Sequence, residues 1–164
     1  MTDSELMQLS MDVGQSLLQR KATVTAAESC TGGWIAKVLT DIAGSSQWFE
    51  RGFVTYSNKA KQALVGVSEE SLARYGAVSE QVVREMAEGA LKEAQADYAL
   101  SVSGIAGPDG GSSEKPVGTV WFGFAASGQK TLAQRQVFTG DREAVRRQAT
   151  AHALLILQDH FLKN

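Results

Sequence analysis

Residues 27–33 read AESCTGG and bring together a hydroxyl, a thiol and two glycines where an extended run passes into a helical pattern. The preceding residues 22–26 (ATVTA) are β-branched or small and predict a short strand. Apolar side chains then recur at helical spacing, at Trp34, Ile35, Val38, Leu39 and Ile42. The glycine pair therefore stands at a predicted helix N-terminus, where free N–H groups attract anions and stabilise an oxyanion. The simpler interpretation is that Ser29 or Thr31 only caps the helix.

Composition limits the class of protein. The chain has 164 residues, of which 43% are hydrophobic, and this suits one globular domain spanning residues 1–164. Cys30 is the only cysteine, which excludes an internal disulfide and fits a reducing compartment. We find no basic leader and no apolar stretch long enough to span a bilayer, and the net charge of −2 argues against nucleic acid as a partner. We therefore expect a soluble cytoplasmic protein that binds neither membranes nor nucleic acid.

The rest of the chain alternates helical and extended patterns. A capping box at Thr2 and Glu5 opens a first helix, and Ser79 and Asp141 are expected to begin two later ones. Residues 98–102 predict a strand, and two runs around an SGQK turn predict a hairpin, residues 117–125 and 131–138. This order indicates an α/β fold with three layers, α/β/α, in which helices cover both faces of a mixed β-sheet.

Residues 53–61, FVTYSNKAK, form an apolar strand that ends in a polar cluster. Strand ends carry chemistry in open α/β sheets. A Lys61 turned inward beside Ser29 would lose hydration, and its lowered pKa would make it a base for the hydroxyl. On a helix Lys59 and Lys61 point about 200° apart, so only one of them faces the site. The competing interpretations are that both lysines are solvated and that Tyr56 is a packing residue with a wet hydroxyl.

A glycine-rich segment, residues 103–113 (SGIAGPDGGSS), directly follows the strand at residues 98–102. Glycines let the backbone approach a ligand closely. We assign residues 103–107 to the site, because they lie nearest the strand end, and interpret residues 108–113 as a turn. An ordinary mobile connection is the alternative interpretation of the whole segment.

Signatures of several common enzyme classes are missing from the chain. It has no P-loop, no dinucleotide-binding glycine motif and no G-x-S-x-G nucleophile elbow. Both histidines, His152 and His160, fall on the last predicted helix, which argues against a Ser-His-Asp triad and a His-rich metal site. Lysine is therefore the best base for a serine nucleophile. Cys30 is the alternative nucleophile, although no histidine near it in the sequence is placed to activate it.

Four runs occur in the order found in the CinA C-terminal domain family, which the chain resembles over most of its length: AESCTGGWIAKVLTDIAGSS, FVTYSNKAK, SVSGIAGPDGG and KPVGTVWFGF. The resemblance implies the fold of that domain, working alone without the additional N-terminal domain of some relatives. It also implies a nicotinamide-nucleotide amidase, which hydrolyses the carboxamide of nicotinamide mononucleotide to nicotinate mononucleotide and ammonia in pyridine nucleotide (NAD) salvage. No metal and no organic cofactor are implied.

Carried onto this chain, the family's residues imply Ser29 as the nucleophile, Lys61 as the base and Tyr56 as an orienting or proton-relaying group. Backbone N–H groups from residues 29–33 or 104–106 would stabilise the oxyanion, and the sequence leaves both loops open. The substrate's phosphate needs an anion site, either at the glycine pair or at an arginine cluster. The expected substrate-binding residues are Thr31, Gly32, Gly33, Ser45, Ser46, Gly104, Ile105, Ala106 and Arg142.

Several alternatives accompany these expectations. Arg146 and Arg147 are weaker phosphate candidates than Arg142, and the cluster can equally be a surface ion-pair network or an oligomer contact. We expect a homo-oligomer, such as a dimer, with Trp48 and Phe49 as candidate contacts. A non-catalytic nucleotide-binding module would use the same glycine loops without needing the serine and the lysine. A role with DNA has little support from the acidic net charge.

Overall fold

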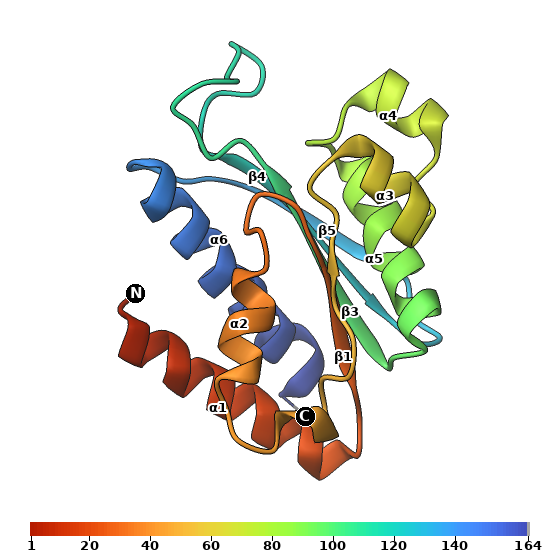
Figure 1. Ribbon diagram of the computed structural model, residues 1–164, viewed down its shortest axis with the longest axis vertical. Coiled ribbons are helices and arrows are strands. Elements are labelled where there is room, and N and C mark those ends of the chain that lie inside the picture. Colours follow the sequence, from red (N-terminus) through yellow and green to blue (C-terminus); the bar gives the residue numbers. More distant parts are fainter. Residues whose placement is uncertain (164) are drawn as a thin grey trace.

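A mixed five-stranded sheet lies between two layers of helices in the computed structural model, which describes residues 1–163 (Figure 1). The strand order is β2-β1-β3-β4-β5. β1 pairs in parallel with β2 and β3, whereas β3, β4 and β5 pair antiparallel. The strands are β1 (Val24–Glu28), β2 (Phe53–Val54), β3 (Tyr98–Gly104), β4 (Thr119–Ala126) and β5 (Leu132–Val137). The expected three-layer α/β fold and its C-terminal hairpin are confirmed.

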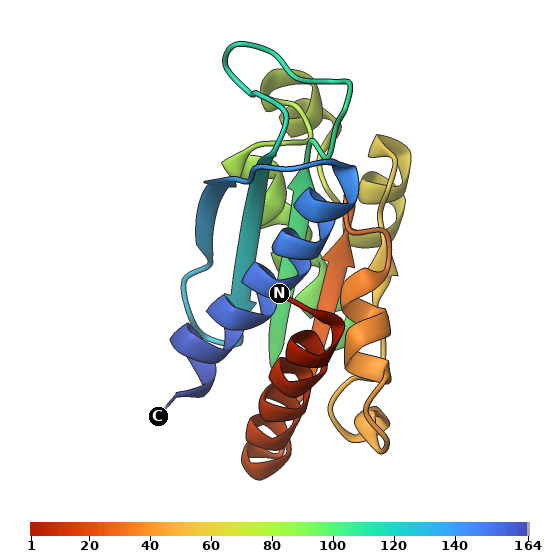
Figure 2. The same ribbon diagram turned by 90° about the vertical axis from the view of Figure 1, so that its left-hand side faces the viewer.

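Helices cover both faces of the sheet. One face carries α1 (Asp3–Arg20), α2 (Trp34–Thr40) and α6 (Arg142–Leu157), which lie in front of the sheet in Figure 2. The other face carries α3 (Asn58–Val65), α4 (Glu69–Tyr75) and α5 (Glu80–Ala94), and α5 packs directly on β1, β3 and β4. Two short turns of helix complete the chain, η1 (Ser45–Gln47) and η2 (Gln158–Leu162). Within residues 1–163, none of the helices combines the length and the apolar character that crossing a bilayer requires.

The helix starts follow the sequence closely. Thr2 and Glu5 form the expected capping box of α1, in which each side chain accepts a hydrogen bond from the other residue's N–H group. Ser79 and Asp141 cap α5 and α6 as expected. These caps satisfy N–H groups that have no partner inside a helix, and so they fix where each helix begins.

Two apolar clusters hold the layers together. The larger lies under α1, α2 and α6, and the smaller lies between the sheet and α5. Trp48 belongs to the larger cluster and is 5% exposed, so it cannot serve as the expected oligomer contact. Its large ring is more stable buried in this core than on the surface, which is why the interface expectation for Trp48 is wrong.

Strand β1 is displaced from its expected position and thereby defines the site. The sequence predicts a strand over residues 22–26, whereas β1 extends to Glu28 because Ala27 and Glu28 pair with both β2 and β3. The parallel strands β1, β2 and β3 consequently end at one edge of the sheet, at Glu28, Val54 and Gly104. The three segments singled out in the sequence all leave the sheet at this edge, which is the usual ligand edge of open α/β sheets.

Candidate active site

Ser29 and Lys61 meet at this edge of the sheet. Ser29 is the first residue after β1, and Lys61 lies in the first turn and a half of α3, which Ser57 caps. The Nζ atom of Lys61 lies 3.0 Å from the Oγ atom of Ser29. A nucleophile and a base in hydrogen-bond contact are the core of a covalent hydrolase site.

Lys61 is held in an unusual environment for a lysine. The residue is only 1% exposed, and its Nζ donates to the carbonyl oxygen of Thr55 at 2.9 Å and to that of Tyr56 at 3.4 Å. Burial lowers the pKa of Lys61 from its ordinary value of 10.5, because the charged form loses hydration. Lys59, two residues earlier, is exposed. The expected division between the two lysines is therefore present, and Lys61 is the inward one.

Glu28 organises the turn that carries Ser29, and the sequence analysis did not single it out. Glu28 is 1% exposed, and its carboxylate accepts hydrogen bonds from the Thr31 hydroxyl at 2.6 Å and from three N–H groups around the start of α2, those of the N-cap Gly33, Ile35 and Ala36. An anion belonging to the protein therefore already occupies the positive end of this helix. The only signal in the sequence was an acidic residue at the end of an otherwise apolar strand.

Arg146 of α6 holds the same turn from the opposite side. Its Nε donates to the Cys30 carbonyl at 2.9 Å, its second guanidinium nitrogen donates to the Thr31 carbonyl at 3.1 Å, and its guanidinium lies 5.6 Å from the centre of the Trp34 ring. Gly32 adopts φ +59°, and a Cβ atom there would lie 3.3 Å from this guanidinium. A larger residue at position 32 would strain both the backbone and this contact.

Cys30 follows Ser29 in the chain, but its thiol is in an environment that makes it unreactive. It is 6% exposed, and burial raises the pKa of its thiol to about 12. Because the thiolate is the nucleophilic form of cysteine, this shift removes most of its reactivity at neutral pH. The Ser29 hydroxyl, which contacts the Lys61 amine, is therefore the stronger candidate for a nucleophile.

A pocket of about 270 Å³ opens onto Ser29 and Lys61. Arg142 crosses its mouth, donating to the Gly107 carbonyl at 2.8 Å and to the Tyr56 hydroxyl at 3.2 Å. Tyr56 is 61% exposed, so its ring forms part of the rim. The remaining walls are Cys30, Asn58, Ala77, Val78, Ser103, Gly104 and Ala106.

The other residues expected to bind substrate do not line the pocket at Ser29 and Lys61. Gly32 and Gly33 line a different hollow beside Arg147, and the Thr31 hydroxyl is bonded to Glu28. Ile105 is absent from the pocket walls, although both its neighbours are present. Ser45 and Ser46 lie in η1, whose following residue Trp48 accepts a bond from Val24 N–H at the opposite end of β1. Arg147 is ion-paired with Asp3 and Glu143.

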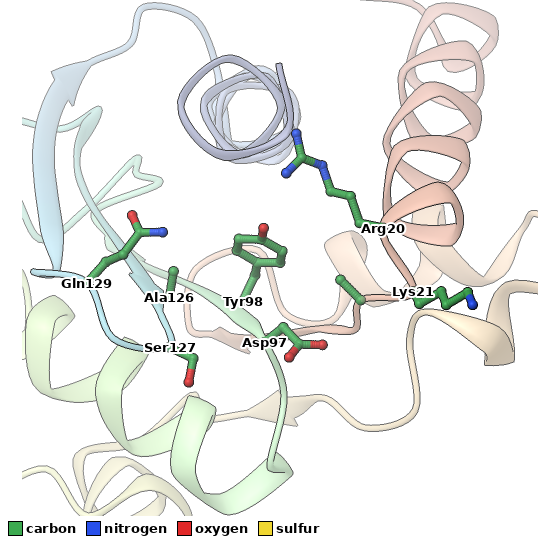
Figure 3. A pocket seen from close by; sticks show the side chains of 8 residues that line it. Arg20, Lys21, Asp97, Tyr98, Ala126, Ser127 and Gln129 are labelled. Atoms are coloured by element: carbon green, nitrogen blue, oxygen red, sulfur yellow. The ribbon is translucent and has the colours of Figure 1, made fainter. Parts of the chain in front are cut away.

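Other hollows lack this chemistry. A larger one, of about 440 Å³, lies at the opposite edge of the sheet, where Arg20, Tyr98 and Gln129 point inward (Figure 3). His152 packs against the rings of Phe122 and Phe138, away from Ser29. Across residues 1–163, no three His, Cys, Asp or Glu side chains are grouped so that they could hold a metal ion.

Comparison with known proteins shows the family of this chain. The family model described as the CinA C-terminal domain matches residues 6–161. The chain belongs to the CinA C-terminal domain family. A CinA relative from Escherichia coli strain K12, named nicotinamide-nucleotide amidohydrolase PncC, is 71% identical over 100% of this chain and 99% of its own length. A protein of the same name from Enterobacter agglomerans is 62% identical over the full length of both chains.

Solved structures in the CinA family share the whole architecture. The competence/damage inducible protein CihA from Agrobacterium tumefaciens superposes with a TM-score of 0.92 and 41% identity, covering 97% of this chain and 96% of its own. The walls contributed by Ala77 and Val78 come from the segment before α5, for which the CinA-like motifs in the sequence gave no signal. Ser103, in contrast, begins the glycine-rich segment that the sequence assigned to the site.

Proposed function

We propose that this chain is a nicotinamide-nucleotide amidohydrolase in which Ser29 is the nucleophile and Lys61 the general base. The observation that carries the proposal is the 3.0 Å contact between Ser29 Oγ and a buried Lys61 Nζ. The 71% identity to a relative named for this activity supports the substrate. With nicotinate mononucleotide as its product, the proposed reaction would serve pyridine nucleotide salvage.

The contacts of Lys61 suit a neutral amine. A neutral lysine amine has two N–H donors and one lone pair, whereas the charged form has three donors and no lone pair. Nζ has two carbonyl oxygens within reach, those of Thr55 and Tyr56, and one hydroxyl, that of Ser29. In the neutral form the two N–H groups serve the carbonyls and the lone pair faces the Ser29 hydroxyl, which turns from the Tyr56 carbonyl, 3.5 Å away, to give its proton to Nζ.

Hydrolysis then proceeds in two stages. Ser29 attacks the carboxamide carbon as Lys61 takes its proton, and the charged Lys61 returns that proton to the departing ammonia. A water molecule, activated by the same lysine, releases the acyl group from Ser29. Every proton transfer uses Lys61, so the mechanism requires no metal and no organic cofactor.

The mouth of the pocket suits the nucleotide part of the substrate. Two N–H groups of Arg142 serve Gly107 and Tyr56, and a guanidinium has five such donors. Arg142 is exposed and can direct the others to the phosphate, while the Tyr56 ring orients the substrate at the rim. We place the carboxamide against Gly104 and Ala106, which line the pocket beside Ser103.

Ammonia release from nicotinamide mononucleotide, measured in the presence of EDTA, tests the proposed function. We expect turnover by the parent protein and its loss in both Ser29→Ala and Lys61→Gln. Nucleotide binding without any turnover by the parent protein would instead favour a binding module. Turnover that persists in Ser29→Ala would show that another residue, with Cys30 the first candidate, is the nucleophile.

A further inference from the structure

The backbone N–H groups of the nucleophile turn can be assigned one by one. From Ser29 to Lys37, all but two donate to a partner among the described residues: to Val102, Ser29, Thr31 and Gly33 carbonyls or to the Glu28 carboxylate. The two exceptions are the N–H groups of Cys30 and Thr31. These residues are 6% and 0% exposed, and buried backbone donors are rarely left without a partner.

We propose that the N–H group of Cys30, a residue that lines the pocket beside Ser29, holds the oxyanion of the reaction, and that Arg146 is the positioning residue that keeps this turn in place. This inference rests on the proposed function, because it takes Ser29 as the nucleophile. Cys30 belongs to the turn before α2, and the first donors of α2 itself are already taken, that of Trp34 by the Thr31 carbonyl and those of Ile35 and Ala36 by Glu28. The oxyanion site is therefore distinct from the helix start.

Each free N–H group belongs to a peptide unit whose carbonyl oxygen is engaged on the other side. The Cys30 carbonyl, which shares a peptide with the Thr31 N–H, accepts from Arg146 at 2.9 Å. The Ser29 carbonyl, which shares a peptide with the Cys30 N–H, accepts from Gly32 at 3.0 Å. N–H and C=O point in opposite directions across a trans peptide, so holding the carbonyls fixes the direction of the donors. A carbonyl that accepts a hydrogen bond also polarises its peptide and strengthens the N–H donor.

The Cys30 N–H group acts on the charge that develops during attack. As the bond between Ser29 Oγ and the carboxamide carbon forms, the carbonyl π bond breaks and its electron pair moves to the amide oxygen. The hydroxyl proton passes to Lys61 Nζ in the same step. The negative oxygen then lies beside the residue that follows the nucleophile, where main-chain donors stabilise it most in the transition state.

Arg147 provides a matched control for Arg146. The two arginines are adjacent on α6, and both guanidinium groups lie against the Trp34 ring, at 5.6 Å for Arg146 and 5.0 Å for Arg147. Arg147 pairs with Asp3 and Glu143 and makes no hydrogen bond to the turn within residues 1–163. Changing either arginine removes one positive charge from the same helix face, but only Arg146 holds the peptides.

The experiment compares Arg146→Gln, Arg146→Lys and Arg147→Gln by steady-state kinetics with nicotinamide mononucleotide. Two ligands report on the site: an analogue in which a boronic acid replaces the carboxamide, which forms a tetrahedral adduct with a serine, and an analogue without the carboxamide. A transition-state mimic should lose affinity in step with the rate, whereas a ligand that never meets the oxyanion site should not. Thermal melting of each variant reports its folding.

For Arg146→Gln we expect a fall in kcat of roughly 100-fold with little change in KM, and a similar loss of boronate affinity. The dissociation constant of the analogue without the carboxamide should change less than about twofold, and Arg146→Lys should show the same pattern with a smaller loss. If Arg146→Gln fails to fold, Arg146→Lys is compared with the parent protein and Arg147→Gln in its place. The inference would be overturned if the folded Arg146 variants kept the kcat and the boronate affinity of the parent protein. It would also be overturned if the affinities for the boronate and for the analogue without the carboxamide fell by the same factor. A parent protein without turnover would overturn the proposed function instead.

Discussion

The two edges of the sheet carry hollows of opposite character. The edge where β1 and β3 end holds a pocket of about 270 Å³ around a buried lysine and a serine, whereas the other edge holds a larger hollow of about 440 Å³ lined by exposed charges (Figure 3). At the larger one, the Asp97 carboxylate already accepts hydrogen bonds from Thr23. Size therefore does not identify the candidate site in this fold; the criterion that does is a titratable group with a shifted pKa beside a side chain that can act as a nucleophile.

The largest difference in activity between the two edges is expected when the serine at each edge, Ser29 or Ser127, is replaced. Ser29→Ala removes the nucleophile, and we expect kcat/KM to fall by roughly 10³-fold or more, since loss of a covalent nucleophile removes the whole reaction path. Ser127→Ala, in the larger hollow, should leave the rate within about twofold, because Ser127 is exposed and far from Lys61. Ammonia release by the two variants checks both expectations, and equal losses would erase the distinction between the edges.

Titration of Lys61 should make both the activity and the stability of the protein depend on pH. Only the neutral amine accepts a proton, so kcat/KM should rise with pH through the pKa of Lys61, which burial places below 10.5. Between that pKa and 10.5 the unfolded chain binds a proton at Lys61 that the folded protein does not, so the free energy of unfolding should also rise with pH.

Denaturant unfolding at several pH values tests this linkage. In Lys61→Met the rise in stability over that window should disappear together with the activity, because the titrating group is gone. Lys59→Met is the matched control, since Lys59 is exposed and lies on the same helix. If the stability of Lys61→Met depended on pH as strongly as that of the parent protein, burial of Lys61 would not be the cause of this dependence.

An arginine from each edge should separate binding from catalysis. Arg142→Gln removes the cation at the mouth of the pocket, and we expect KM for nicotinamide mononucleotide to rise roughly tenfold to a hundredfold with a smaller change in kcat. Arg20→Gln, in the opposite hollow, should change neither constant. An unchanged KM in Arg142→Gln would show that Arg142 does not bind the substrate phosphate.

The smallest effect is expected at the opposite edge and should concern stability alone. Asp97 accepts the N–H group of Thr23 at 2.8 Å, and this bond ties the start of β1 to that of β3. Asp97→Ala should lower the free energy of unfolding by about 1 kcal/mol, the net contribution of a typical hydrogen bond, and leave kcat unchanged. Urea unfolding and steady-state rates together test the point, and a fall in kcat would indicate coupling between the two edges.

Local signals in the sequence were sufficient for much of the fold. The capping residues Thr2, Ser79 and Asp141 and the alternation in the hairpin depend on near neighbours, and each was located correctly. The end of β1 depends on pairing with two distant strands, so residues 22–26 alone placed it two residues early. Tertiary pairing of this kind overrides local propensity.

The site shows the same division between local and distant signals. Lys61 was singled out because it follows a strand end closely, and the structure brings its amine to Ser29. Glu28 was missed because its role depends on donors that only the folded turn presents. Ser45 and Ser46 were grouped with the site through their nearness in sequence, yet α2 carries the chain away to the other end of β1.

Detection of the acyl-enzyme would show which side chain attacks the carboxamide. The protein is quenched in acid during turnover of nicotinamide mononucleotide and cleaved after Lys21 and Lys37, which isolates residues 22–37 with both candidate nucleophiles. We expect fragmentation of this peptide to locate the nicotinate mononucleotide acyl group on Ser29, and we expect the adduct to be absent from Lys61→Gln. An acyl group on Cys30, or undiminished adduct formation without Lys61, would contradict it.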